Sequence, residues 1–225
     1  MDHVDPKDIR HLVVLGHPAE QSFNRSVAEA YCHTVEECGQ TAILRDLYAM
    51  GFDPLLKADE RPGLPGFAPS PDVRQELDLI RDCAVITLIY PLWFGMPPAI
   101  IKGYLDRVLG AGVLASELKE GSPHHFLHGK RLAIFSSSGS TRPWLEEKGH
   151  WRSLRQAFEI YLGEIFSLKG DDHLHFDAIV SNSPEQYIHE NLEMLHERAR
   201  TICATVLSER HARQMRLLCG ERALA

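Results

Sequence analysis

Residues 17–24, His-Pro-Ala-Glu-Gln-Ser-Phe-Asn, combine polar side chains with the expected start of a helix. Ser22 and Asn24 stand just before a helical pattern, so their oxygens can cap the helix while its first backbone N–H groups stay open to an anion. A phosphate group is the natural ligand for such a helix end. A plain helix cap without any ligand explains the same residues equally well.

Residues 91–97, Pro-Leu-Trp-Phe-Gly-Met-Pro, place two large aromatic side chains directly after a strongly apolar run. Trp93 and Phe94 are costly to leave in water unless something flat covers them. A planar cofactor would cover them. Packing against a neighbouring loop or a second subunit is the alternative.

Residues 136–141, Ser-Ser-Ser-Gly-Ser-Thr, offer small hydroxyls and backbone N–H groups, which suit a polar ring edge or an oxyanion. The chain contains neither a GK[ST] phosphate-binding loop nor a G-x-S-x-G elbow, which argues against P-loop enzymes and α/β-hydrolases. A G-x-G-x-x-A run at 110–115 follows a predicted helix rather than a strand. It therefore fails the structural test for a dinucleotide-binding fingerprint.

Thirteen histidines include two close sets, His124, His125 and His128 in one loop and His173 with His175 on one strand face. No nearby cysteine or carboxylate completes either set as a metal site, so we expect surface histidines and no metal. The five cysteines contain no CxxC pair. An odd number at irregular spacing indicates reduced thiols in a cytoplasmic protein.

The composition favours a small-molecule ligand. The 225 residues carry 24 Lys and Arg against 31 Asp and Glu, and the net charge of −7 disfavours nucleic acid as a partner. Residues 84–101 have no charged side chain and are as long as a membrane span, but Pro91, Gly95, Pro97 and Pro98 fit a strand, a loop and a new helix better. The N-terminus lacks the pattern of a signal peptide.

Strands alternate with helices along the whole chain. Short β-branched runs predict strands at 11–15, 41–47, 84–90, 131–136 and 173–180, and apolar periodicity predicts helices after residues 21 and 72, from 98, around 154–165 and over 184–209. We expect an α/β fold in one domain over 1–225: a five-stranded parallel sheet with helices on both faces and a flexible tail at 210–225. The ligand then lies outside the carboxyl ends of the strands, where loops 16–24, 91–97 and 136–150 meet.

Together the three stretches resemble the flavodoxin-like NAD(P)H:quinone oxidoreductase family, the DT-diaphorase and bacterial quinone reductase group. The matching runs are His17-Pro with Gln21-Ser-Phe-Asn24, Tyr90-Pro-Leu-Trp93, Pro98-Ala-Ile-Ile-Lys-Gly-Tyr-Leu-Asp-Arg107 and Ser137-Ser-Gly-Ser140. The resemblance implies a flavodoxin-like homodimer that holds a noncovalent flavin, FAD with FMN as the alternative. It also implies NAD(P)H as the hydride donor and transfer through flavin N5 to a quinone-like acceptor in a ping-pong cycle.

The same resemblance assigns the site residues. The flavin-binding residues would be His17, Gln21, Ser22, Phe23 and Asn24 at the phosphate and adenosine side, Pro91, Leu92, Trp93, Phe94 and Gly95 along the ring, and Ser137, Ser138, Gly139 and Ser140 at the pyrimidine edge. Trp144, which is also expected to bind the flavin, falls where relatives often carry a Tyr, and Gly149-His150 matches their catalytic histidine. Because an indole has no O–H with which to pass a proton, a proton relay would rest on His150 or on water, and His150 is the expected catalytic residue.

Two other functions are compatible with a bound flavin. Some relatives are regulatory partners of a membrane transporter, a role for which Arg210, Arg213, Arg216 and Arg222 would provide the docking surface. An electron carrier of the flavodoxin type is the other, but it would need neither His150 nor a pocket for a second substrate. The resemblance therefore favours the enzyme.

Overall fold

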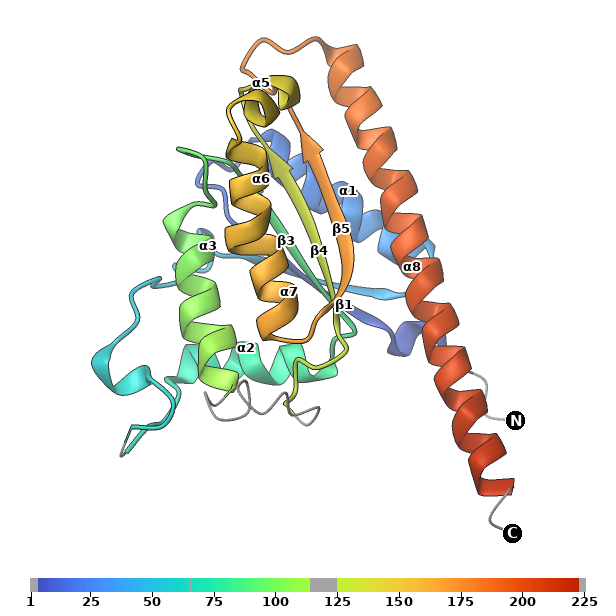
Figure 1. The fold of residues 1–225 in the computed structure, drawn as a ribbon. Helices are drawn as coiled ribbons and strands as arrows, with labels where there is room; N and C mark the ends of the chain where they lie inside the picture. The colour runs from blue at the N-terminus through green and yellow to red at the C-terminus, as the bar shows by residue number, and fades with distance from the viewer. Residues whose placement is uncertain (1–3, 65, 114–124, 223–225) are drawn as a thin grey trace.

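A five-stranded parallel sheet forms the centre of the computed structural model, which describes residues 4–64, 66–113 and 125–222 (Figure 1). The strands are β1 (Arg10–Leu15), β2 (Thr41–Asp46), β3 (Val85–Pro91), β4 (Arg131–Ser137) and β5 (Lys169–Phe176), in the spatial order β2-β1-β3-β4-β5. In the ladder, Leu15 pairs with Asp46 and Ile89, and Ile89 pairs with Phe135. The chain reverses its direction of travel across the sheet between β1 and β3, which is where such folds bind ligands.

Helices cover both faces of this sheet, and each face has its own apolar core. On one face α1 (Phe23–Glu37) packs against α8 (Glu185–Arg222), with Val13, Leu15 and Phe135 beneath them. The other face carries α2 (Pro71–Asp82), α3 (Ala99–Tyr104), α6 (His150–Leu154) and α7 (Tyr161–Ile165) over Leu12 and Val14. Successive strand residues thus point into different cores, which explains why residues 12–15 of β1 are all apolar and why β3 is apolar except at Thr87.

Shorter helical turns complete the described elements: η1 (Pro6–Asp8), η2 (Ala58–Glu60), η3 (Leu105–Leu109), η4 (Gly110–Gly112), α5 (Arg142–Glu147) and η5 (Arg155–Ile160). The turns η3 and η5 are π-helical. None of the helices within the described residues is both long and apolar enough to cross a membrane. His124 lies outside the described residues.

The loop after β1 is held close to α3. A Cβ on Gly16 would come within 2.5 Å of Ile101 Cγ1, so only glycine lets the chain leave β1 at this point. The chain then turns into α1 at Phe23, where Ser22 is the N-cap and its Oγ accepts a hydrogen bond from the Arg25 N–H at 3.2 Å. Both features fix where the first predicted loop emerges from the sheet.

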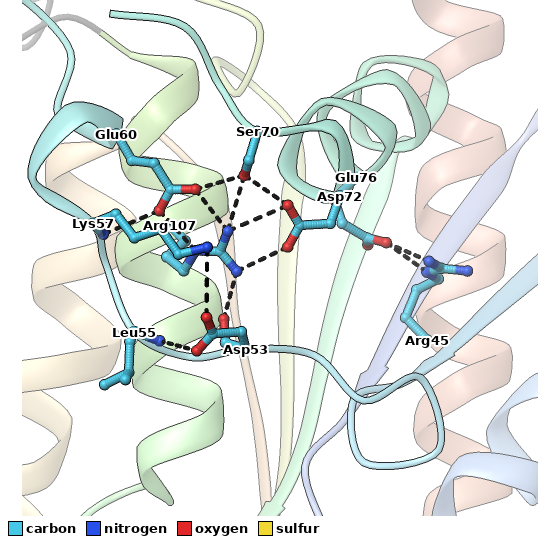
Figure 2. A network of polar contacts seen from close by, with 9 residues as sticks. All are labelled: Arg45, Asp53, Leu55, Lys57, Glu60, Ser70, Asp72, Glu76 and Arg107. Carbon is cyan, nitrogen blue, oxygen red and sulfur yellow. Dashed lines mark hydrogen bonds and ion pairs between the residues drawn. The ribbon is translucent and has the colours of Figure 1, made fainter.

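A buried arginine fastens the long loop between β2 and α2 to the body of the protein (Figure 2). Arg107, from η3, donates to Glu60 Oε1 at 2.7 Å and to Asp72 Oδ2 at 2.9 Å, and it also reaches the Asp53 carbonyl and the Ser70 hydroxyl. Its side chain is only 1% exposed. The loop is therefore attached at three places along its length.

The bounds of β5 and the carboxyl end of α8 differ from the sequence prediction. The strand runs over Lys169–Phe176 rather than 173–180, because its pairing with β4 begins at Arg131 and ends at Ser137. The expected tail from Arg210 is instead a continuation of α8 to Arg222, which projects past the sheet (Figure 1). Good helix formers continue through this stretch, and Arg210 donates a hydrogen bond to the Asp8 carbonyl at 2.9 Å.

Candidate functional site

A cavity of about 640 Å³ lies at the carboxyl ends of β1, β3 and β4. The residues that line it come from four loops and two helix starts: His17, Gln21, Ser22, Phe23, Asn24 and Ser26; Pro91, Leu92 and Trp93; Ser137, Ser138 and Gly139; and Ile179, Val180, Ser181, Ser183 and Ile188. The three loops that the sequence singled out therefore meet at one place. Its volume falls within the usual range for small-molecule sites.

The first side of the cavity is the amino end of α1. The first N–H groups of a helix have no acceptor within it, and the Ser22 cap satisfies only that of Arg25. The N–H groups of Phe23 and Asn24, two of the lining residues, are thus available to an anion, and the helix dipole favours negative charge there.

Asn24 joins this side of the cavity to the third loop. Its side chain is almost fully buried, and its Nδ2 donates to Ser137 Oγ at 2.9 Å. Nearby, the ring of Phe23 packs edge-on against Phe176 at a centroid distance of 5.2 Å. These contacts set the position of the α1 start relative to the end of β4.

His17 offers a hydrogen-bond donor at the mouth of the first loop. Its Nδ1 accepts from the Ala19 N–H at 3.1 Å, so a neutral ring carries its proton on Nε2. Burial lowers the pKa of His17, which favours that neutral form. The ring lies 6.0 Å from that of Trp93, measured between centroids.

The second loop is a tight turn that separates its two aromatic residues. Trp93 N–H donates to Met96 O at 3.0 Å and Met96 N–H donates to Trp93 O at 3.1 Å, with Phe94 at φ 52° and Gly95 at φ 79° between them. Two consecutive positive φ values define the hairpin turn that favours Asn-Gly, and here Phe occupies the first position. As a result Trp93 lines the cavity, whereas Phe94 is fully exposed and neither it nor Gly95 lines the cavity.

The third loop presents backbone groups. The Ser138 N–H donates to Phe176 O at 3.0 Å and the Ser138 carbonyl accepts from the Ile179 N–H at 2.9 Å. Those bonds leave Gly139 as the next backbone donor along the wall of the cavity. They also tie the wall to the loop that follows β5.

Ser140, Trp144 and His150 do not line this cavity. Trp144 belongs to α5 and His150 begins α6, and their rings pack against each other at a centroid distance of 5.5 Å. Gly149, at φ 73°, lets the chain turn from one short helix into the next. Both side chains are exposed on the segment that leaves β4.

One wall was missed by the sequence analysis. Ile179, Val180, Ser181 and Ser183 follow β5, and Ile188 lies in the first turn of α8. The prediction extended the fifth strand to Val180 and so counted half of this loop as sheet. The signal that could have found it is its position, because every loop at the carboxyl edge of a parallel sheet borders the same crevice.

The assembled site suits a ligand with an anionic group at one end and a flat ring with polar edges at the other. The helix start provides the anion site, Trp93 the apolar surface, and Ser137 with Gly139 the polar edge. These features fit a flavin nucleotide.

Comparison with known proteins identifies the family. The sequence profile of the flavodoxin-like fold matches residues 9–199. An uncharacterized NAD(P)H oxidoreductase of Haemophilus influenzae is 34% identical over 170 residues, which cover 75% of this chain and 82% of that protein. The NAD(P)H dehydrogenase [quinone] 1 of Rattus norvegicus is 30% identical over 149 residues, 58% of this chain, and the match spans about half of the rat protein, 54%.

Solved structures agree with the sequence relatives. An NAD(P)H:quinone oxidoreductase from Methanothermobacter marburgensis superposes with a TM-score of 0.72 at 25% identity, over 86% of this chain and 96% of that one. An FMN-dependent NADH-azoreductase from Bacillus anthracis shares the fold, with a TM-score of 0.63 at 15% identity over 87% of this chain and 99% of that one. The predicted flavodoxin-like fold is therefore confirmed, and with its sequence relatives this chain belongs to the flavodoxin-like family of NAD(P)H:quinone oxidoreductases.

Proposed function

We propose that this protein is a flavin-dependent NAD(P)H:quinone oxidoreductase. One observation carries the proposal: the α1 amino end, the Trp93 ring and the Ser137–Gly139 backbone, which are distant in sequence, line the same cavity. When bound there, a flavin supplies the hydride chemistry, and the protein contributes binding, orientation and electrostatics.

The residues of the cavity divide this work between them. The N–H groups of Phe23 and Asn24 hold the phosphate, and Nε2 of His17 adds a donor at the first loop. Trp93 would cover the ring, and the Gly139 N–H would be a donor for the pyrimidine edge, where negative charge develops on reduction. A donor already aimed at that edge needs no reorganisation when the charge appears.

FAD is the proposed nucleotide, with FMN as the alternative. The cavity continues past the α1 amino end toward Ser183 and Ile188 at the start of α8. An adenosine needs space beyond the phosphate, and the Ile188 side chain is an apolar surface suited to an adenine face. Chromatography of the cofactor released by denaturation distinguishes FAD from FMN directly.

His150 remains the proposed proton donor to the acceptor. It begins α6 on the segment that leaves β4, the same strand end that carries the polar wall, and the Trp144 ring at 5.5 Å orients its imidazole. Hydride delivery to a quinone creates an oxyanion, and a positioned imidazole can supply its proton.

We further propose a homodimer in the cytoplasm. Trp93, Phe94, Met96 and Trp144 expose large apolar surface around the site, which a second subunit would cover. The four cysteines whose side chains are described, Cys32, Cys38, Cys83 and Cys203, are free thiols, which suits a reducing compartment.

Oxidation of NADH or NADPH by the purified protein with a simple benzoquinone tests the proposal. We expect a yellow protein and parallel lines in double-reciprocal plots, the pattern of a ping-pong cycle. A colourless protein that takes up neither FAD nor FMN would overturn the flavin assignment. A yellow protein without turnover would overturn the enzymatic one.

The last helix favours a second candidate, a regulatory flavoprotein that docks onto a transporter. Beyond Glu209, α8 exposes Arg213, Met215, Arg216 and Leu217 to solvent. None of these four residues lines the cavity. Under this alternative, flavin binds but quinone turnover is absent.

A further inference from the structure

A line of hydrogen bonds runs from the wall of the cavity into the protein. Ser138 Oγ lies 3.0 Å from His175 Nε2, and His175 Nδ1 lies 2.8 Å from Ser136 Oγ. The same Ser136 Oγ is 2.7 Å from His173 Nε2, and His173 Nδ1 is 2.8 Å from Glu159 Oε2. Only Ser138, at one end, lines the cavity.

The inner part of the line is shielded from solvent, so the expectation that His173 is a surface histidine was wrong. The His173 side chain is 3% exposed and that of Glu159 is 9% exposed. The Trp151 ring packs on both imidazoles, with centroid distances of 4.8 Å to His173 and 5.0 Å to His175. A proton that reaches Glu159 from the cavity must therefore travel along the hydrogen-bonded atoms.

Charged groups face the line from several elements. Arg155 of η5 pairs with Glu159 at 3.1 Å, and Arg142 of α5 lies over Trp151 at 3.8 Å from its centroid. Burial lowers the pKa of His175 to about 4, with His173 and Arg142 acting in the same direction and Asp177 in the opposite one. His175 is therefore neutral near pH 7 and suited to pass a proton rather than to hold it.

The same atom positions accommodate two hydrogen-bond arrangements. In the first, Ser138 donates to His175 Nε2, His175 Nδ1 donates to Ser136, Ser136 donates to His173 Nε2, and His173 Nδ1 donates to Glu159. In the second, every bond between Ser138 and His173 is reversed, and His173 carries a proton on both ring nitrogens.

Ser138 has a second partner that the reversed arrangement requires. Its Oγ is 2.8 Å from the Ser140 carbonyl, and a single hydroxyl proton can serve either that carbonyl or His175 Nε2. In the first arrangement the Ser138 hydroxyl donates to His175 Nε2, and in the second it donates to the Ser140 carbonyl. The two arrangements differ by one proton and leave the described polar atoms of the line paired.

We propose that the His173–Glu159 pair stores one proton and exchanges it with the flavin cavity through Ser136, His175 and Ser138. The proposal rests on the proposed function, which places a flavin in that cavity. On release, the proton on His173 Nε2 passes to Ser136, the Ser136 proton to His175, the His175 proton to Ser138, and the Ser138 proton to the negative group in the cavity. Each O–H or N–H bond that breaks is replaced by one that forms, and the electrons come from NAD(P)H.

The stored proton belongs at the inner end because Glu159 is there. The Glu159 carboxylate accepts the His173 Nδ1 hydrogen bond in both arrangements, so that bond stays in place when a proton is added at Nε2. A reduced flavin bound in the cavity would add negative charge there and so favour a proton in the line. On reoxidation the line would return that proton to the cavity, where it replaces the one that His150 donates to the acceptor.

The test compares the flavin midpoint potential against pH for the flavin-loaded wild type and His173→Gln. A glutamine keeps hydrogen-bonding atoms but cannot gain a proton. Across the neutral range we expect the wild-type slope to be steeper by about 30 mV per pH unit, because one extra proton per two electrons changes the equilibrium tenfold per unit. Glu159→Gln should flatten the slope in the same way.

His33→Gln is the matched control. It removes a histidine that pairs with Glu37 at 3.3 Å on the exposed side of α1, so its slope should equal that of the wild type. Equal slopes for wild type and His173→Gln in flavin-loaded protein would overturn the proton store while leaving the proposed function intact. A protein that binds no flavin would overturn both.

Imidazole nitrogen NMR of the wild type needs no variant. We expect His173 to gain a second ring proton when the flavin is reduced, while His175 stays neutral. Ring nitrogens of His173 that are unchanged between the oxidised and reduced states would contradict the proposal even if both variants failed to fold.

Discussion

At the scale of single residues, the cavity depends on a few side chains with two duties. Asn24 both lines the cavity and connects α1 to β4 through its bond to Ser137 Oγ. His17 uses one ring nitrogen to hold its own loop and keeps the other for a ligand. Substitutions at such positions should therefore affect ligand binding and folding together.

Asn24→Ala removes the donor to Ser137 and leaves that buried hydroxyl without its partner. We expect the free energy of unfolding to fall by about 1–2 kcal/mol and flavin affinity to weaken as well. Urea denaturation and quenching of flavin fluorescence measure the two effects. Asn182→Ala, an exposed position on the loop after β5, is the control and should change neither.

His150→Ala should leave flavin content unchanged, because His150 does not line the cavity. We expect at least one half-reaction to slow roughly tenfold or more, which corresponds to about 1.4 kcal/mol per factor of ten. Stopped-flow absorbance follows each half-reaction separately. Traces that match the wild type would make His150 an ordinary surface residue. His189→Ala, which removes an exposed histidine of α8, is the control and should leave both half-reactions unchanged.

At the scale of elements, one buried arginine connects three segments that are distant along the chain. Arg107 of η3 holds Glu60 of η2, within the long loop, and Asp72 of α2, directly after that loop (Figure 2). The hydrogen bonds from Arg107 are the largest cause of the shift that lowers the pKa of Glu60 from 4.5 to about 2. A charged pair so deeply buried costs little only while both partners are present.

Arg107→Leu leaves Glu60 buried without its cation, and we expect a loss of about 3–5 kcal/mol in the free energy of unfolding near pH 7. Because the folded-state pKa of Glu60 is depressed, the stabilisation is present above pH 4.5 and is lost as the pH falls toward 2. The difference between wild type and variant should therefore shrink over that interval.

Urea denaturation at a series of pH values measures this difference. Arg81→Leu is the control, since Arg81 pairs with Asp78 on the exposed side of α2 and such surface pairs contribute about 0–1 kcal/mol. A difference between wild type and Arg107→Leu that stays constant from neutral pH down to acid pH would mean that Glu60 is not the group responsible.

At the scale of the whole molecule, large apolar side chains are exposed on the turn that follows the cavity residue Trp93. Phe94 stands fully exposed at the tip of the turn, and Trp93, Met96 and Trp144 are partly exposed. In solution such a surface favours association. Light scattering at micromolar concentration should give twice the chain mass of 25.4 kDa.

Phe94→Asn tests whether this surface forms the dimer contact. Asparagine tolerates the positive φ of the turn, so the substitution removes the ring without disturbing the backbone. We expect the mass to shift toward 25.4 kDa. Leu55→Asn, at another exposed apolar position, should leave the mass unchanged, and a dimer that survives Phe94→Asn would assign the contact to a different face.

Much of the architecture could be predicted from the sequence. The central residues of β1, β3 and β4 are mostly apolar because both faces of the sheet are covered, and the helices between them carry one apolar stripe each. Alternating strands and helices require a parallel sheet, and a parallel sheet brings its carboxyl-end loops together. His17, Ser22, Trp93 and Ser138 could therefore be placed in one site from sequence alone.

Tertiary structure decided where individual side chains point. Phe94 and Trp93 are neighbours in sequence, yet the positive φ values of the turn direct only Trp93 to the cavity. Likewise the register of β5 against β4 was needed to align His173 and His175 with Ser136, since a shift of one residue would turn both to the other face. Local sequence determines which elements form, whereas turn geometry and strand register arise from contacts between distant segments.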